Sequence, residues 1–153
     1  MKLNADCVRD ILLYIEENVN YEDSSNPTFH NELMFGKLLA DDTFKKYNKE
    51  ELTYALELLI KEHFIECAEN PYFVRGALMS ANIIGLTWNG YELLDNIRDN
   101  TVWGAVKAKA AKFKGLSIST LASSAKILAA ALMKDPNAVK NFLQGVENIK
   151  TLF

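Results

Sequence analysis

The chain has 153 residues, of which 49% are hydrophobic, with 7 glycines and 3 prolines, and this composition excludes collagen-like, low-complexity and disordered proteins. A chain of this length can bury enough apolar surface to fold without disulfides or a structural metal. Residues 1–100 carry 9 Lys/Arg and 18 Asp/Glu whereas residues 101–153 carry 8 and 2, so an acidic body of charge −9 precedes a basic tail of charge +6.

The first predicted helix covers Ala5 to Asn18. Its apolar residues recur at helical spacing and are Val8, Ile11, Leu12, Ile15 and Val19. Turn-forming residues dominate 20–27. A short helix is expected over Phe35 to Ala40 and a longer one over Lys49 to Glu62, for which Asn48 is a suitable N-cap.

His63 stands where the longer helix should end, and histidine tolerates the left-handed conformation in which helices often terminate. Residues 64–68 are predicted to form a strand, Asn70-Pro71 a turn, and a second strand is expected within Ala77 to Leu86. Thr87 can then cap a helix that carries Leu93, Leu94 and Ile97. Helix, short helix, helix, β-hairpin, helix is the order of a winged-helix domain with an added helix.

The composition changes after residue 100. A basic helical stretch covers 101–113, and Gly115 interrupts it. A heptad-like seam follows, made of Ile118, Leu121, Ala125, Leu128 and Leu132. This seam could join two chains or cover the chain's own core. Asp135-Pro136 is a favourable start for a last helix. The expected fold is therefore mainly α with a small β-hairpin (α+β): a winged-helix-type domain over 1–100 and a basic helical C-terminal extension over 101–153.

Two segments carry a resemblance to a known family. Met1 to Asn18 reads MKLNADCVRDILLYIEEN, and Leu86 to Asp99 reads LTWNGYELLDNIRD, followed by Val102-Trp103. On these segments the chain resembles a family of phage and prophage proteins known as domain of unknown function 2513. The resemblance implies phage ancestry and a winged-helix-like fold, and it implies no activity. Ala55 and Tyr91 stand where the family pattern often has histidine, so any role of those histidines is absent here.

No metal, cofactor or catalytic site is expected. A metal would need Cys7, Cys67, His30 and His63 to converge, and their spacing matches no zinc pattern. The chain has no glycine-rich phosphate loop and no Gly-x-Ser-x-Gly motif. Its adjacent acidic pairs point in different directions on a helix, which is typical of a solvated surface. We therefore expect a protein that is not an enzyme and has no small-molecule substrate.

Membrane insertion is not expected either. The N-terminus lacks an apolar signal stretch, and the longest apolar run, residues 127–133, is too short to cross a bilayer. Two separate cysteines are compatible with a reducing environment, and the expected location is the cytoplasm.

DNA binding is the function that a winged helix suggests, since the second helix of a helix-turn-helix enters the major groove. The candidate contacts to nucleic acid or another partner are Lys45, Lys46, Lys49, Arg75, Lys107, Lys109, Lys112 and Lys114. However, four acids offset four lysines over 45–62, and the body as a whole would repel phosphates. A protein partner, or self-association through the seam, is therefore favoured, with a DNA-binding regulator as the alternative.

Overall fold

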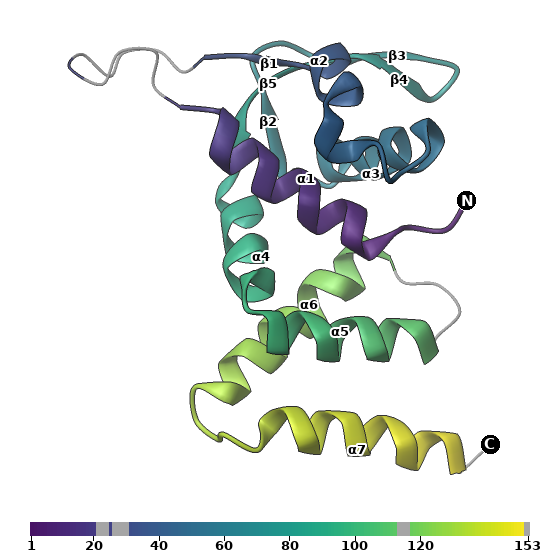
Figure 1. Cartoon of the computed structure of the whole chain (residues 1–153), viewed down its shortest axis with the longest axis vertical. Coiled ribbons are helices and arrows are strands. Elements are labelled where there is room, and N and C mark those ends of the chain that lie inside the picture. Colours follow the sequence, from purple (N-terminus) through teal and green to yellow (C-terminus); the bar gives the residue numbers. More distant parts are fainter. Residues whose placement is uncertain (21–24, 26–30, 113–116, 152–153) are drawn as a thin grey trace. The chain divides into compact units, whose positions relative to one another are not determined.

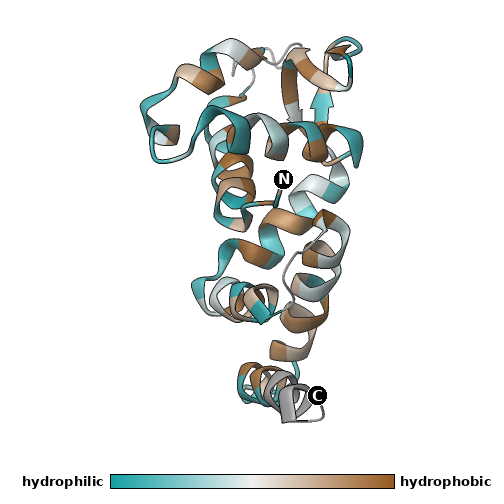
Figure 2. Cartoon of the chain, turned by 90° about the vertical axis from the view of Figure 1, so that its right-hand side faces the viewer, coloured by the Kyte–Doolittle hydropathy of each residue, from teal (hydrophilic) through white to brown (hydrophobic). Residues whose placement is uncertain are grey.

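The computed structural model of the chain describes residues 1–20, 25, 31–112 and 117–151, with residues 145–151 described through their backbone alone. The fold is mainly helical with small antiparallel sheets, which confirms the predicted α+β class (Figure 1). Figure 2 shows hydrophobic and hydrophilic residues alternating along the helices, as expected for helices with one buried face. Among the described residues, no helix combines the length and the apolarity needed to traverse a bilayer.

The chain divides into two compact units. One consists of Met1 and Asp6–Tyr91, and the other of Lys2–Ala5 and Glu92–Phe153. The division falls inside a helix, between Tyr91 and Glu92, whereas the boundary expected from the sequence was residue 100. An ion pair at 2.9 Å between Glu92 Oε1 and Lys126 Nζ joins the second half of that helix to the C-terminal helices.

The helices of the first unit lie where the sequence predicted them. They are α1 (Ala5–Asn18), α2 (Phe35–Ala40) and α3 (Lys49–Lys61), with a 3-10 turn η1 (Asp42–Phe44) between the last two. Asn48 caps α3 as predicted. Its side chain accepts a hydrogen bond from the Glu51 N–H at 2.8 Å, and the Glu51 side chain accepts one from the Asn48 N–H at 3.2 Å.

In the described part of the chain, short strands form two antiparallel sheets. The strands are β1 (Leu33–Met34), β2 (Ile65–Cys67), β3 (Tyr72–Val74), β4 (Ala77–Ser80) and β5 (Asn82–Leu86). β5 lies between β1 and β2, whereas β3 pairs with β4.

The predicted strand within 64–68 and a second strand within Ala77 to Leu86 are present as β2 and β5, but the latter stretch holds two strands and not one. The stretch is divided at Ala81, whose carbonyl oxygen accepts a 2.9 Å hydrogen bond from the Phe35 N–H at the start of α2. As a result β4 pairs with β3 and β5 pairs with β2. β1 and β3 are two and three residues long, too short to show the alternation by which strands are recognised.

The remaining helices are α4 (Trp88–Arg98), α5 (Asn100–Lys112), α6 (Ile118–Leu132) and α7 (Ala138–Thr151). α5, α6 and α7 pack on one another, and α6 crosses α5 obliquely in Figure 1. α7 begins at Ala138, slightly later than predicted, because Asp135 first closes a turn by accepting the Asn137 N–H at 2.9 Å.

The seam predicted on α6 is buried within the chain. Ile118, Leu121, Ala125 and Leu128 are at most 3% exposed, and Leu132 is half-buried. Of the two roles that the sequence left open, these side chains serve the chain's own core. Any self-association would therefore have to use other residues.

Candidate functional site

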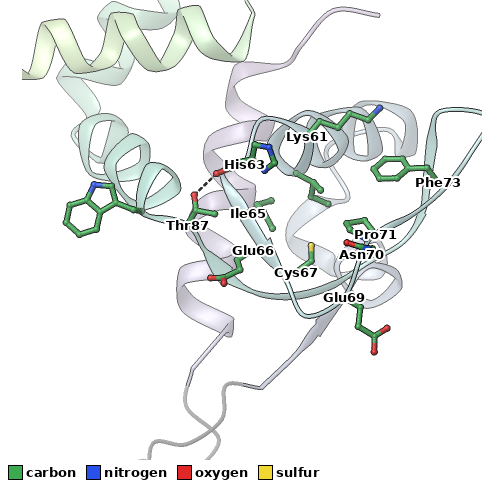
Figure 3. Close-up of a pocket in the computed structure, with 12 residues that line it drawn as sticks. Lys61, His63, Ile65, Glu66, Cys67, Glu69, Asn70, Pro71, Phe73 and Thr87 are labelled. Atoms are coloured by element: carbon green, nitrogen blue, oxygen red, sulfur yellow. Dashed lines mark hydrogen bonds between the residues drawn. The ribbon is translucent and has the colours of Figure 1, made fainter.

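An open cleft of about 540 Å³ lies where the end of α3 meets β2, β3 and the start of α4. We call it the hairpin cleft (Figure 3). Its apolar lining residues are Ile60, Ile65, Cys67, Pro71, Phe73 and Trp88, and its polar ones are Lys61, His63, Glu66, Glu69, Asn70 and Thr87. In Figure 3, Thr87 and Phe73 lie at opposite ends of the group. Trp88 follows Thr87 in the chain and therefore belongs to the Thr87 end.

His63 turns the chain from α3 into β2. Its φ is 59°, and its N–H donates a hydrogen bond to the carbonyl oxygen of Ile60 at 3.1 Å. The next N–H, that of Phe64, donates to the carbonyl oxygen of Leu59 at 2.8 Å. The left-handed helix ending predicted at His63 is therefore confirmed, and it directs the following residues along the wall of the cleft.

Thr87 fastens the start of α4 to this turn. Its hydroxyl donates to the His63 carbonyl oxygen at 2.6 Å and accepts from the Gly90 N–H at 3.1 Å. Its own N–H donates to the carbonyl oxygen of Phe64 at 3.1 Å. The predicted N-cap is confirmed, and the same side chain fixes one end of the hairpin cleft.

Gly90 allows α4 to approach the turn closely. A β-carbon built on it would overlap the carbonyl oxygen of Phe64 and would lie 3.1 Å from Cβ of Leu86. Leu86 itself is 5% exposed. In the segment Leu-Thr-Trp-x-Gly, the leucine, threonine and glycine therefore all have structural roles.

Trp88, in contrast, has no comparable packing role. It is 85% exposed although it stands in the middle of the same segment. An indole left in water forgoes a large hydrophobic stabilisation, and aromatic residues exposed at a cleft are typical anchors of binding surfaces. The side chain of Trp88 is thus largely unpacked and available to a partner.

The β3–β4 hairpin adds a second exposed apolar surface. Tyr72 is 63% exposed, Val74 40% and Met79 54%. Leu78 points to the opposite, buried face at 3% exposure, as the alternation along a strand requires. We call Tyr72, Val74 and Met79 the apolar hairpin face.

Lys61 holds the hairpin against α3. Its Nζ lies 3.3 Å from Glu57 Oε1, 3.3 Å from the carbonyl oxygen of Gly76, and 5.0 Å from the centre of the Phe73 ring. Arg75 and Gly76 form the hairpin turn with φ values of 50° and 85°, as in a two-residue type I′ turn. The ammonium group of Lys61 therefore interacts with groups of its own chain.

A second, polar hollow of about 460 Å³ adjoins α1 and the η1 region. The Tyr14 hydroxyl donates to Asp41 Oδ2 at 2.8 Å, and the Tyr47 hydroxyl donates to Asp10 Oδ2 at 2.7 Å. Burial, reinforced by the bond to Asp41, raises the pKa of Tyr14 to about 12. Burial and then Asp10 raise the pKa of Tyr47, while hydrogen bonds from Thr43 and then Tyr14 lower the pKa of Asp41. These pairs fasten α1 to the segment before α3.

The predicted basic contacts of the first unit are not assembled into one patch. Lys45 Nζ lies 2.7 Å from Asp42 Oδ1, and Lys46 Nζ lies 2.6 Å from Asp10 Oδ2. Lys49 is exposed at the start of α3. Arg75 is also exposed, but it lies near the opposite end of α3, since the next residue, Gly76, contacts Lys61 there. Twelve residues of helix separate those ends by about 18 Å. The predicted basic residues of the first unit therefore form no single surface, because some pair with aspartates and the others lie far apart.

The tail lysines contact aromatic rings of their own unit. Lys107 Nζ lies 5.8 Å from the centre of the Trp103 ring, and Lys109 Nζ lies 4.4 Å from that of Phe142. Lys112 is half-buried. The predicted contact Lys114 lies outside the described residues.

Cys67 and His63 both line the hairpin cleft, whereas Cys7 lies on α1. Cys7 is buried, and its burial raises the pKa of the thiol to about 12. Burial also raises the pKa of Cys67, which lines the hairpin cleft. His30 lies outside the described residues. Within the described ranges, no three His, Cys, Asp or Glu side chains are placed to hold a metal ion.

The hairpin cleft, Trp88 and the apolar hairpin face were not predicted from the sequence. A signal was present in Tyr72-Phe73-Val74 followed by Arg75-Gly76, which is a short apolar strand before a glycine-containing turn. The exposure of Trp88 had no such signal, because a tryptophan beside a helix cap is more often part of a core.

Comparison with known proteins gives a family and a relative. A family model described as hypothetical protein (DUF2513) matches residues 2–117. The chain is 32% identical over 119 residues to an uncharacterized protein of Haemophilus influenzae (strain ATCC 51907 / DSM 11121 / KW20 / Rd), and the match covers 78% of this chain and 86% of that protein. No solved structure shows a significant match.

Proposed function

This chain belongs to the DUF2513 family, whose description assigns no activity, and on that premise we propose that it is a non-enzymatic protein-binding module of phage or prophage type, built on a winged-helix body. The hairpin cleft, with Trp88 at one end, is its binding surface. A cytoplasmic location accompanies this proposal.

The winged-helix assignment is supported by the order of the elements. α1, β1, α2 and α3 are followed by β2, the β3–β4 hairpin and β5, and β1 pairs with β5 in an antiparallel sheet. The hairpin takes the place of a wing. Because folds of this kind host many functions, the function has to be argued from the surface.

The exposure of Trp88 is the observation that carries the proposal. At 85% exposed, it places an indole ring in water at the edge of a cleft half of whose lining is apolar. Tryptophan is enriched among the few residues that dominate protein–protein binding energy. The apolar hairpin face, on the same unit, is a second exposed apolar surface.

DNA binding is the second candidate, and the tail lysines favour it. Phosphate contacts need free cations gathered on one surface. Lys45 and Lys46 instead face aspartates within ion-pair distance, and residues 1–100 carry a net charge of −9. A protein partner therefore suits the first unit better.

Self-association belongs to the same proposal as a second kind of protein binding. It cannot use the four buried seam residues. The exposed apolar side chains of the α6 region are Ile127 at 65% and Met133 at 90%. A dimer formed there would bury these two side chains.

A differential capture experiment tests the proposal. Immobilised wild-type protein, Trp88→Ala and the control Met34→Ala are incubated with the same bacterial lysate. The control removes a side chain that is 52% exposed and belongs neither to the hairpin cleft nor to the apolar hairpin face. We expect a protein retained by the wild type and by Met34→Ala and lost with Trp88→Ala. A retained set that is identical for all three proteins contradicts the assignment to Trp88.

A titration with labelled mixed-sequence duplex DNA at low and at higher salt decides the alternative. Micromolar binding that weakens steeply with salt favours the DNA-binding regulator. Absence of binding at low salt removes it.

A further inference from the structure

We propose that the hairpin cleft binds a basic, apolar segment of a partner protein, in which a Lys or Arg side chain stands beside a bulky apolar one. This inference rests on the proposed function, because it specifies the chemistry of the partner for the same surface.

The acidic side of the cleft supplies the first argument. Glu66 on β2 and Glu69 in the following loop both line the cleft and are exposed. In Figure 3 their carboxylates lie on the side opposite Lys61. Among the described residues, no cation lies within ion-pair distance of either one. Both carboxylates are therefore available to a cationic group of a partner.

The one lysine of the lining does not neutralise this side. Lys61 is already shared between Glu57, the Gly76 carbonyl oxygen and the Phe73 ring. Two carboxylates thus set the sign of the charge that a ligand meets in the cleft. An anionic segment would be repelled, whereas a cationic one would gain charge-assisted hydrogen bonds.

The aromatic lining supplies the second argument. Lys61 over Phe73 shows that a cation and an aromatic face already pair within this cleft. Trp88 offers a larger and more electron-rich ring and is 85% exposed. A cation over an indole gains more than over the other aromatic side chains. A Lys or Arg of the partner therefore has two compatible neighbours here, a carboxylate and an indole.

The surrounding charge supplies the third argument. Residues 6–91, which make up nearly all of this unit, carry 7 Lys/Arg and 15 Asp/Glu, and their net charge of −8 produces a field that draws cationic segments toward the unit. The apolar lining explains why the segment also needs a bulky apolar side chain, since Ile65, Pro71 and Phe73 offer a hydrophobic surface for it. Charge and apolar contact together define the segment.

Selection from a random peptide library displayed on phage tests this inference on the full-length protein. Peptides from enriched clones are synthesised and titrated calorimetrically against the wild type, Glu66→Gln/Glu69→Gln and Trp88→Ala. The matched control is Glu32→Gln/Glu50→Gln, which removes the same charge from exposed side chains that do not line the cleft.

We expect enriched peptides with Lys or Arg next to an aromatic or aliphatic residue. Their affinity should fall about three- to tenfold in Glu66→Gln/Glu69→Gln, as for two solvent-accessible ion pairs. It should fall more than about tenfold in Trp88→Ala and stay unchanged in the control.

Other results overturn the inference in distinguishable ways. Equal weakening in the two charge variants would mean general attraction to an acidic protein and not recognition in the cleft. Neutral or acidic peptides that still depend on Trp88 would contradict the basic segment and leave the proposed function standing. Failure to obtain any peptide that depends on Trp88 would contradict both.

Discussion

The hydroxyl of Thr87 donates a 2.6 Å hydrogen bond to the carbonyl oxygen of His63, which precedes it by 24 residues. Through this bond, the residue that caps α4 also holds the left-handed turn at which α3 ends. One side chain therefore couples a helix start, a helix end and one end of the hairpin cleft.

Replacement of Thr87 by valine keeps the shape of the side chain and removes its donor and its acceptor. We expect Thr87→Val to lower the free energy of unfolding by about 1–2 kcal/mol, the usual cost of a lost N-cap and of the hydrogen bonds it makes. Urea denaturation followed by circular dichroism measures this. Thr87→Ser retains the hydroxyl and should lie close to the wild type. If serine and valine are equally destabilising, the methyl group and not the hydroxyl is what matters.

Gly90→Ala places a methyl group against the carbonyl oxygen of Phe64, which is backbone and cannot rotate away. We expect a loss of about 1–3 kcal/mol or more, as for other overpacked sites, and a lower thermal midpoint. Gly36→Ala is the control, since a β-carbon there has no atom within 4 Å and alanine favours a helix by about 0.5–1 kcal/mol over glycine. Equal stability of the two variants would show that α4 can shift away from the turn.

The Tyr14–Asp41 pair makes stability depend on pH in a way that Tyr14→Phe removes. The folded-state pKa of Tyr14 is raised from 10.0 to about 12, so its contribution is fully present below pH 10.0 and is lost as the pH rises toward about 12. Hydrogen bonds from Thr43 and then from Tyr14 lower the pKa of Asp41 from 3.8, so its contribution is present above pH 3.8 and is lost as the pH falls through the folded-state pKa. Tyr14→Phe removes only the Tyr14 part of this contribution.

We therefore expect the difference in free energy of unfolding between the wild type and Tyr14→Phe to be largest near neutral pH and to shrink at both extremes. Urea denaturation at a series of pH values measures it. Tyr47 titrates in both proteins and cancels in the difference. Tyr54→Phe is the control, because the described residues give its hydroxyl no hydrogen bond. A difference that does not vary with pH would contradict the coupling.

Truncation of two adjacent residues of α6 should change the free energy of unfolding by very different amounts. Leu128 is 1% exposed and Ile127 is 65% exposed. We expect Leu128→Ala to cost about 2–5 kcal/mol because it leaves a cavity, and Ile127→Ala to stay within about 0.5 kcal/mol. Size-exclusion chromatography of the same variants tests self-association. If Ile127→Ala changes the oligomeric state and Leu128→Ala does not, α6 contacts a second chain through its exposed side.

Local sequence signals were enough to locate the helices of this fold. The apolar spacing of α1, the Asn48 capping box and the cap at Thr87 involve residues within one or two turns of each other, so a single sequence displays them. The left-handed His63 could be predicted for the same reason, since the helix pattern stops there and histidine tolerates that conformation.

Features that depend on distant partners could not be predicted in this way. Lys46 appeared as a free candidate contact, and only the fold brings it to Asp10 on α1. Ala81 interrupts a strand-like stretch because of a bond to Phe35, far away in the chain. The exposure of Trp88 likewise depends on how α4 meets β2, and no pattern of neighbouring residues encodes it.

The chain contains two tryptophans, Trp88 and Trp103, and they lie in opposite surroundings, at 85% and 3% exposure. Their fluorescence should differ accordingly, with red-shifted emission from the solvated indole and blue-shifted emission from the enclosed one. The protein thereby carries two built-in optical reporters, one at the hairpin cleft and one within α5. Occupancy of the cleft and melting of the C-terminal helices become separable in a single emission spectrum, without any attached dye.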